Sequence, residues 1–341
     1  MRFDFTEDQH EIKRTASDLL ASRSTPEKQR EAAESAEYDL ALWAELAELG
    51  WPGVAVEEGF GGGGLGYVEL AGLLEEAGYA LLNGPFLSTA ICAAAISEAG
   101  SDEQKEEWLA RLASGEVTGA FGLLGQIVPD GASSDVVVLA EPDGQAASLI
   151  AGVGAMPSLS TIDPTRRYGL AEGELTTGDP LPGDVRRAID IATVLVSAEL
   201  VGVCRRVLDM TVEYVKDRQQ FGRPVGSFQA IQHRCAQMLL STEGARAATY
   251  FAAWAADSDP ERLPEAASIA KSAASKAGIE VTASAIQAHG GIGFTWEADV
   301  HWFFKRAQLD AAFLGSSSEH NQSLTALTSP EARVATPPRG V

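Results

Sequence analysis

Cysteine is scarce in this sequence of 341 residues and follows no recognisable pattern. The three cysteines, Cys92, Cys204 and Cys235, lie far apart, and none belongs to a Cys-x-x-Cys pair. This spacing argues against a zinc ribbon or a disulfide framework, and free thiols fit a reducing compartment. The cysteines therefore predict a cytoplasmic protein.

Basic residues are also few compared with acidic ones. Lys and Arg total 26 against 48 Asp and Glu, which gives a net charge of −22 and a pI near 4.6. A broad basic surface for phosphate backbones is therefore not expected, and nucleic acid is excluded as a predicted partner. The most apolar long window, 188–204, contains Asp190 and Glu199 and is shorter than the ~20 apolar residues of a spanning helix. The polar N-terminus predicts no export signal, and no membrane contact is expected.

Several catalytic and nucleotide-binding signatures are missing from the sequence. It has no Gly-x-Gly-x-x-Gly after a strand, no P-loop, no His-Glu-x-x-His and no Gly-x-Ser-x-Gly. Hydropathy does not alternate between strand and helix either, so a parallel dinucleotide-binding sheet is not expected. No metal site is predicted from these motifs.

Helical spacing of apolar residues dominates both ends of the chain. The pattern predicts helices over 6–22, 26–48, 66–80, 103–115, 184–217, 226–256, 262–289 and 297–313, with a glycine-rich loop over 50–66. Short strands are predicted at 136–139, 148–150 and 168–170. The prediction is a mainly α protein with a small β domain: an N-terminal helical domain (1–117), a shortened middle β domain (118–183), a C-terminal helical bundle (184–327) and a tail (328–341).

One cluster of potential binding residues follows the helix predicted to end near residue 217. It begins Arg218-Gln-Gln-Phe-Gly, so Arg218 and Phe221 lie at a turn between two helices. A guanidinium beside an aromatic ring could hold a pyrophosphate and stack on a planar group. An arginine on a surface turn with a core phenylalanine explains the same residues.

A second cluster, Gln287-Ala-His-Gly-Gly-Ile-Gly-Phe, ends another predicted helix. The paired glycines Gly290 and Gly291 would let another molecule approach the backbone closely. An ordinary helix end followed by a turn explains them equally well, and His289 is interpreted as a packed or exposed histidine. The acidic pairs Glu57-Glu58 and Glu75-Glu76 are predicted to be solvated.

Together the domain order and these clusters resemble the acyl-CoA dehydrogenase family. The resemblance also includes segment 43–58, which runs into the glycine loop, and segment 69–78. It implies an FAD-dependent oxidoreductase, a flavoprotein of fatty acid or steroid β-oxidation within lipid metabolism. In that family the equivalents of Arg218, Phe221, Gln287, Gly290 and Gly291 contact the adenine-diphosphate half of FAD bound mainly by a neighbouring subunit, which implies an oligomer.

The sequence departs from the family where the catalytic base should be. The usual glutamate precedes a Gly-Thr pair, and Leu314 occupies that position; an alternative glutamate position is occupied by Ala192. Segment 120–129 also lacks the Thr-Glu-Pro-like strand that holds the flavin ring in relatives. Asp190, Asp310 and Glu319 are the acids considered as substitutes for the base.

The pattern from Leu314 to His320 resembles the shorter, non-catalytic subunit of heteromeric actinobacterial acyl-CoA dehydrogenases. The leading hypothesis is that this chain completes the FAD site of a longer, glutamate-bearing homologue in a heterotetramer that dehydrogenates an acyl-CoA, with a steroid side-chain CoA ester as one candidate. Two alternatives stay open: a self-sufficient homo-oligomer with a displaced base, and a redox-inactive CoA-ester binding or scaffold protein.

Overall fold

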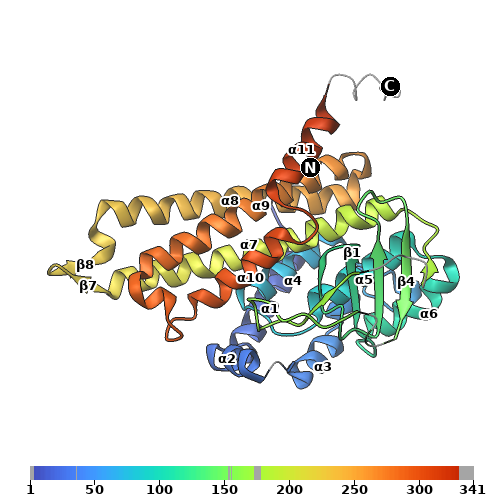
Figure 1. The fold of residues 1–341 in the computed structure, drawn as a ribbon, viewed down its shortest axis with the longest axis horizontal. Helices are drawn as coiled ribbons and strands as arrows, with labels where there is room; N and C mark the ends of the chain where they lie inside the picture. Colours follow the sequence, from blue (N-terminus) through green and yellow to red (C-terminus); the bar gives the residue numbers. More distant parts are fainter. Residues whose placement is uncertain (1–3, 36, 153, 155, 173–177, 330–341) are drawn as a thin grey trace.

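Helices lie at both ends of the chain and short strands lie between them (Figure 1). The computed structural model describes residues 4–35, 37–152, 154, 156–172 and 178–329. The N-terminal part contains α1 (Glu7–Arg23), α2 (Pro26–Ser35), α3 (Leu40–Glu48), α4 (Tyr67–Tyr79), α5 (Phe86–Ala99) and α6 (Asp102–Ala113). The C-terminal part contains α7 (Val185–Asp217), α8 (Gln229–Ser258), α9 (Leu263–His289), α10 (Val300–Ala312) and α11 (Ser317–Thr328).

The middle strands form two small sheets. The first has the order β1-β3-β4-β6, with β1 parallel to β3 and the other pairs antiparallel. The second pairs β2 with β5. The strands are β1 (Gly119–Leu123), β2 (Ile127–Pro129), β3 (Val136–Ala140), β4 (Ala147–Ala151), β5 (Tyr168–Leu170) and β6 (Asp179–Pro180). The predicted fold class is confirmed, while the predicted domain boundaries stay predictions.

Three sequence predictions of helices were wrong in detail. The single helix expected over 26–48 is two helices, because the Asp39 side chain accepts hydrogen bonds from two backbone N–H groups and starts α3. Helix α5 was missed because nearly all its residues are buried, which removes the amphipathic period. Helix α11 was missed although Ser316 and Glu319 form a capping box at its start. Most of the predicted tail lies outside the described residues.

Helix α7 runs through the middle of the molecule and packs against α4, α5, α8, α9 and α10. Its crossing with α4 depends on two glycines. A Cβ at Gly202 would lie 1.9 Å from the Glu75 carbonyl oxygen, and one at Gly78 would lie 2.1 Å from that of Glu199. Only glycine allows this approach. The contact fixes the helical bundle on which the candidate site is built.

Candidate functional site

The first predicted cluster forms a tight hairpin between α7 and α8. Strands β7 (Gln219–Gln220) and β8 (Arg223–Pro224) pair antiparallel, and the turn residues Phe221 and Gly222 have φ values of 54° and 79°. A two-residue hairpin turn of this kind needs positive φ at both central positions, which suits glycine and strains phenylalanine. The Phe221 ring is 91% exposed. Arg218 ends α7 and is exposed beside it.

The second cluster lies where α9 ends. Gly290 ends the helix with φ 67°, and Gln287, Gly290 and Gly291 are all exposed. A Cβ built at either glycine would meet nothing within 4 Å, so neither glycine is needed for packing within this chain. The open backbone at this point fits close approach by another molecule.

The structure brings these two clusters to the same end of the helical bundle (Figure 1). The rings of Tyr214, near the end of α7, and His289, at the end of α9, stack with centroids 4.4 Å apart. The Tyr214 hydroxyl also donates to the His289 carbonyl oxygen at 3.3 Å. His289 itself is buried, which lowers the pKa of its ring, so it serves here as a packed histidine.

Exposed Arg218, beside the hairpin, and exposed Gln287 with the glycine backbone, at the end of α9, are groups that suit an anion. The Arg218 guanidinium has no hydrogen-bond or ion-pair partner among the described residues. Arginine and backbone N–H groups are the usual ligands of pyrophosphate. The residues present therefore fit contact with the diphosphate part of a dinucleotide held mainly by another chain.

Sequence reasoning missed Trp296 on the adjoining loop, although Phe294, which ends the second predicted cluster, lies two residues before it. Trp296 is 69% exposed, and Phe294 is 80% exposed. Behind Trp296 lie His301 and Trp302, whose ring nitrogens are buried and have no partner among the described residues. The signal was present in the sequence, since both exposed rings closely follow the paired glycines.

The two expected positions of the catalytic base are occupied by apolar side chains inside the core. Ala192 lies in α7 and is fully buried, and Leu314 is 4% exposed with φ 59°. Both belong to one continuous apolar cluster. The Leu314 backbone N–H donates to the Gln126 side-chain oxygen at 3.2 Å, so the turn between β1 and β2 touches this position directly.

The three acids considered as substitutes for the base lie in three different environments. Glu319 caps α11 through Ser316. Asp310 is buried beside Glu199, and burial together with that negative charge raises its pKa well above the usual value. Asp190 lies in α7, where burial raises its pKa to about 7.

A buried ionic cluster fixes segment 163–168 to the helices around Asp310. Arg166 forms an ion pair with Glu199 at 2.5 Å, and Arg306 pairs with Asp163 at 2.6 Å. All four side chains are at most 2% exposed. Most of these charged groups pair with one another, so the cluster holds the fold together, while Arg166 Nε and Asp310 Oδ2 have no hydrogen-bond partner among the described residues.

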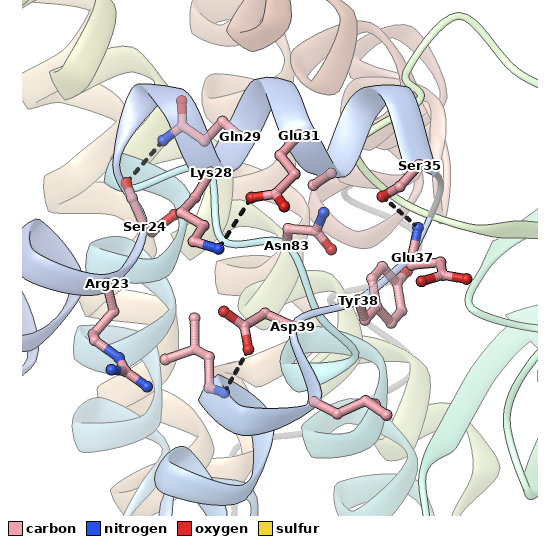
Figure 2. Close-up of a pocket in the computed structure, with 13 residues that line it drawn as sticks. Arg23, Ser24, Lys28, Gln29, Glu31, Ser35, Glu37, Tyr38, Asp39 and Asn83 are labelled. Carbon is pink, nitrogen blue, oxygen red and sulfur yellow. Dashed lines mark hydrogen bonds and ion pairs between the residues drawn. The ribbon is translucent and has the colours of Figure 1, made fainter.

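A hollow of about 390 Å³ lies elsewhere, among α1, α2 and α3. Figure 2 shows polar side chains around it, including Lys28, Glu31 and Asn83. It contains none of the predicted site residues. Among the described helices, none is long and apolar enough to cross a membrane.

Comparison with known proteins agrees with this arrangement. Residues 6–116 match the family model for the acyl-CoA dehydrogenase N-terminal domain, and residues 184–324 match the model for the C-terminal domain. The chain therefore belongs to the acyl-CoA dehydrogenase family, whose members are FAD-dependent oxidoreductases.

Individual relatives cover nearly the whole chain. It is 36% identical over 324 residues to acyl-CoA dehydrogenase IpdE2 of Mycolicibacterium smegmatis, covering 94% of this chain and 99% of the relative. It is 37% identical over 315 residues to IpdE2 of Mycobacterium tuberculosis, covering 92% and 95%.

Two solved structures also match nearly the whole chain. The ChsE4-ChsE5 complex from Mycobacterium tuberculosis matches with a TM-score of 0.85 at 25% identity, covering 99% of this chain and 100% of that chain. A variant of the steroid ACAD Tcur3481-Tcur3483 matches with a TM-score of 0.86 at 27% identity, covering 97% and 99%.

Proposed function

We propose that this chain is the non-catalytic subunit of a heteromeric acyl-CoA dehydrogenase. It completes the FAD site of a longer partner that carries the catalytic glutamate, and the complex, a heterotetramer in the cytoplasm, dehydrogenates an acyl-CoA between its α and β carbons. The proposed substrate class is a steroid side-chain CoA ester. Two similar structures support this choice, since one is the ChsE4-ChsE5 complex and the other is a steroid ACAD.

The observation that carries the proposal is the contact between Gln126 and Leu314. In the family the reaction needs a carboxylate on one side of the acyl group and a flavin ring, held by the middle strands, on the other. Here the residue at the base position and the turn after β1 are joined by a hydrogen bond of 3.2 Å. This contact lies where the family would place the acyl group and the flavin ring, and it supports the proposal that this chain has no working site of its own.

The partner's FAD would be held at the opposite, exposed end of the helical bundle. Arg218 would donate to its pyrophosphate oxygens, and Gln287 and the backbone at Gly290 and Gly291 would supply further contacts. Phe221 would cover the adenosine part. FAD supplies the hydride acceptor of the reaction, while this chain's residues bind and orient its nucleotide half.

The experiment compares the chain purified alone with the chain co-expressed with an acyl-CoA dehydrogenase homologue encoded beside its gene. We expect the isolated chain to be colourless and the mixed complex to be yellow and active. A yellow homo-oligomer that reduces its flavin with an acyl-CoA would overturn the proposal in favour of the self-sufficient enzyme. Two colourless preparations would favour the scaffold.

Within the mixed complex, Arg218→Ala should reduce the retained FAD because a charge-assisted contact to the pyrophosphate is lost. Such contacts contribute about 1.5–3 kcal/mol, which corresponds to roughly 10- to 150-fold in affinity. Arg14→Ala is the matched control, since Arg14 is an exposed arginine of α1. FAD content is measured by visible absorbance, and equal content in both variants would contradict the assigned role of Arg218.

A further inference from the structure

The loop between α9 and α10 carries an exposed tryptophan that the contacts described above do not include. Trp296 is 69% exposed, and it follows closely on Gly290 and Gly291. Large aromatic side chains are mostly buried in folded proteins, and exposed ones next to a binding surface often make contacts. Phe294, two residues before it, is 80% exposed, so this loop presents two large open rings that suit a partner outside this chain.

Other side chains of this chain hold Trp296 in place from behind. The Lys305 ammonium lies 4.4 Å from the Trp296 ring centroid and 4.6 Å from that of Trp302. The His301 ring meets Trp296 edge-on at 4.9 Å. One side of the indole is thus supported while most of the side chain stays open. A ring fixed in this way loses little conformational entropy on binding.

The groups near Trp296 indicate the chemical class of the partner that it would bind. The open glycine backbone at the start of the same loop suits phosphate, Lys305 adds positive charge over the ring, and the indole offers a flat apolar face. A planar base attached to phosphate matches this combination better than an acidic protein surface does.

We propose that the open face of Trp296 stacks on the adenine ring of the FAD held by the partner subunit. This inference rests on the proposed function and adds a specific binding residue to it. Base stacking on aromatic side chains is strong enough to affect affinity and requires no hydrogen-bond pattern. Trp296 would thus select for the adenine dinucleotide over a flavin without the adenosine part.

The test removes FAD from the purified mixed complex and measures its rebinding. Trp296→Leu keeps an apolar side chain but loses the ring, and we expect FAD affinity to fall by about 5- to 150-fold, the range of alanine substitutions at stacking residues. Trp296→Phe should restore most of the affinity. Leu40→Ala is the matched control, since Leu40 is a 74% exposed apolar residue of α3.

A second measurement uses ADP, which carries the adenine and the diphosphate without the flavin ring. ADP should quench tryptophan emission of the flavin-free complex, and Trp296→Phe should remove this quenching. The same FAD affinity in Trp296→Leu and wild type would overturn the inference. So would a lower complex mass for Trp296→Leu, because that result assigns Trp296 to the subunit contact.

The wild-type complex separates the inference from the proposal on which it rests. If wild type fails to rebind FAD, both are overturned. If wild type and Trp296→Leu rebind FAD equally while Arg218→Ala does not, only the stacking role of Trp296 fails.

Discussion

Among single residues, Glu75 departs most clearly from its sequence-based prediction. The pair Glu75-Glu76 was predicted to be solvated like Glu57-Glu58. The prediction was right for the second pair and wrong for the first, since Glu75 is fully buried. Lys13, 2.5 Å away, and Arg205, also 2.5 Å away, pair with it from α1 and α7. These partners lie far away in the chain, so local sequence could not reveal them.

Glu75→Gln should lower the free energy of unfolding by about 1–3 kcal/mol, because it removes a buried carboxylate that pairs with Lys13 and Arg205, while Glu76 remains as a partner of both. Glu57→Gln, at an exposed position, should change it by no more than about 0.5 kcal/mol. Urea unfolding followed by circular dichroism measures both. Equal midpoints for the two variants would show that the buried ion pairs do not stabilise the fold.

The same residue predicts a pH dependence. Burial alone would raise the pKa of Glu75, but the positive charges of Lys13, Arg205 and Arg246 outweigh burial and hold the pKa below 4.5. The carboxylate therefore stabilises the fold above the pKa of the unfolded side chain, and this contribution is lost as the pH falls through the lower folded pKa. The difference in unfolding free energy between wild type and Glu75→Gln should narrow below pH 4.5.

At the scale of elements, sequence patterns predicted the helices with one apolar face and missed those without it. The predicted helix at 262–289 closely matches α9, whereas α5 has no polar face to give a period. The hairpin and the glycine pair were identified as binding candidates from residue type alone. Their meeting at one end of the bundle depends on the stacking of Tyr214 on His289, a contact that only the folded chain provides.

The C-terminal end of α10 is stabilised by a lysine of another helix. The Lys271 ammonium, on α9, donates to the carbonyl oxygens of Asp310, Ala311 and Gly315 at 2.9–3.1 Å. It thereby satisfies the last carbonyls of α10 and fixes the turn that contains Leu314. Lys271→Met leaves these buried acceptors without a donor and should cost at least about 1–3 kcal/mol of stability.

Lys276→Met is the matched control, because Lys276 lies on the same helix and is exposed. Thermal unfolding of both variants measures the difference. A melting temperature of Lys271→Met equal to that of the control would show that α10 ends stably without the ammonium.

At the scale of the whole molecule, the proposal divides the family's active site into two parts with different surroundings. Arg218, Gln287 and the paired glycines are exposed, whereas Leu314, at the proposed position of the base, is buried and contacts Gln126. A chain built in this way can contribute to a neighbour's nucleotide site without having a working site of its own. Both features stay predictions from the resemblance, and the contact between Leu314 and Gln126 could not be predicted because it joins two segments far apart in the chain.

This arrangement predicts the flavin content of the complex. If only the partner holds a flavin ring, the mixed complex should contain one FAD for each pair of unlike chains, because Leu314 of this chain contacts Gln126 where the family would place the flavin ring. Native mass spectrometry, together with absorbance of the released flavin, measures the ratio. Leu314→Glu should not raise the turnover, since a carboxylate at that position faces no flavin, and it should lower the stability because it buries a carboxylate in the apolar cluster. A second FAD in each pair of chains, or turnover that rises with Leu314→Glu, would show that this chain retains a working site.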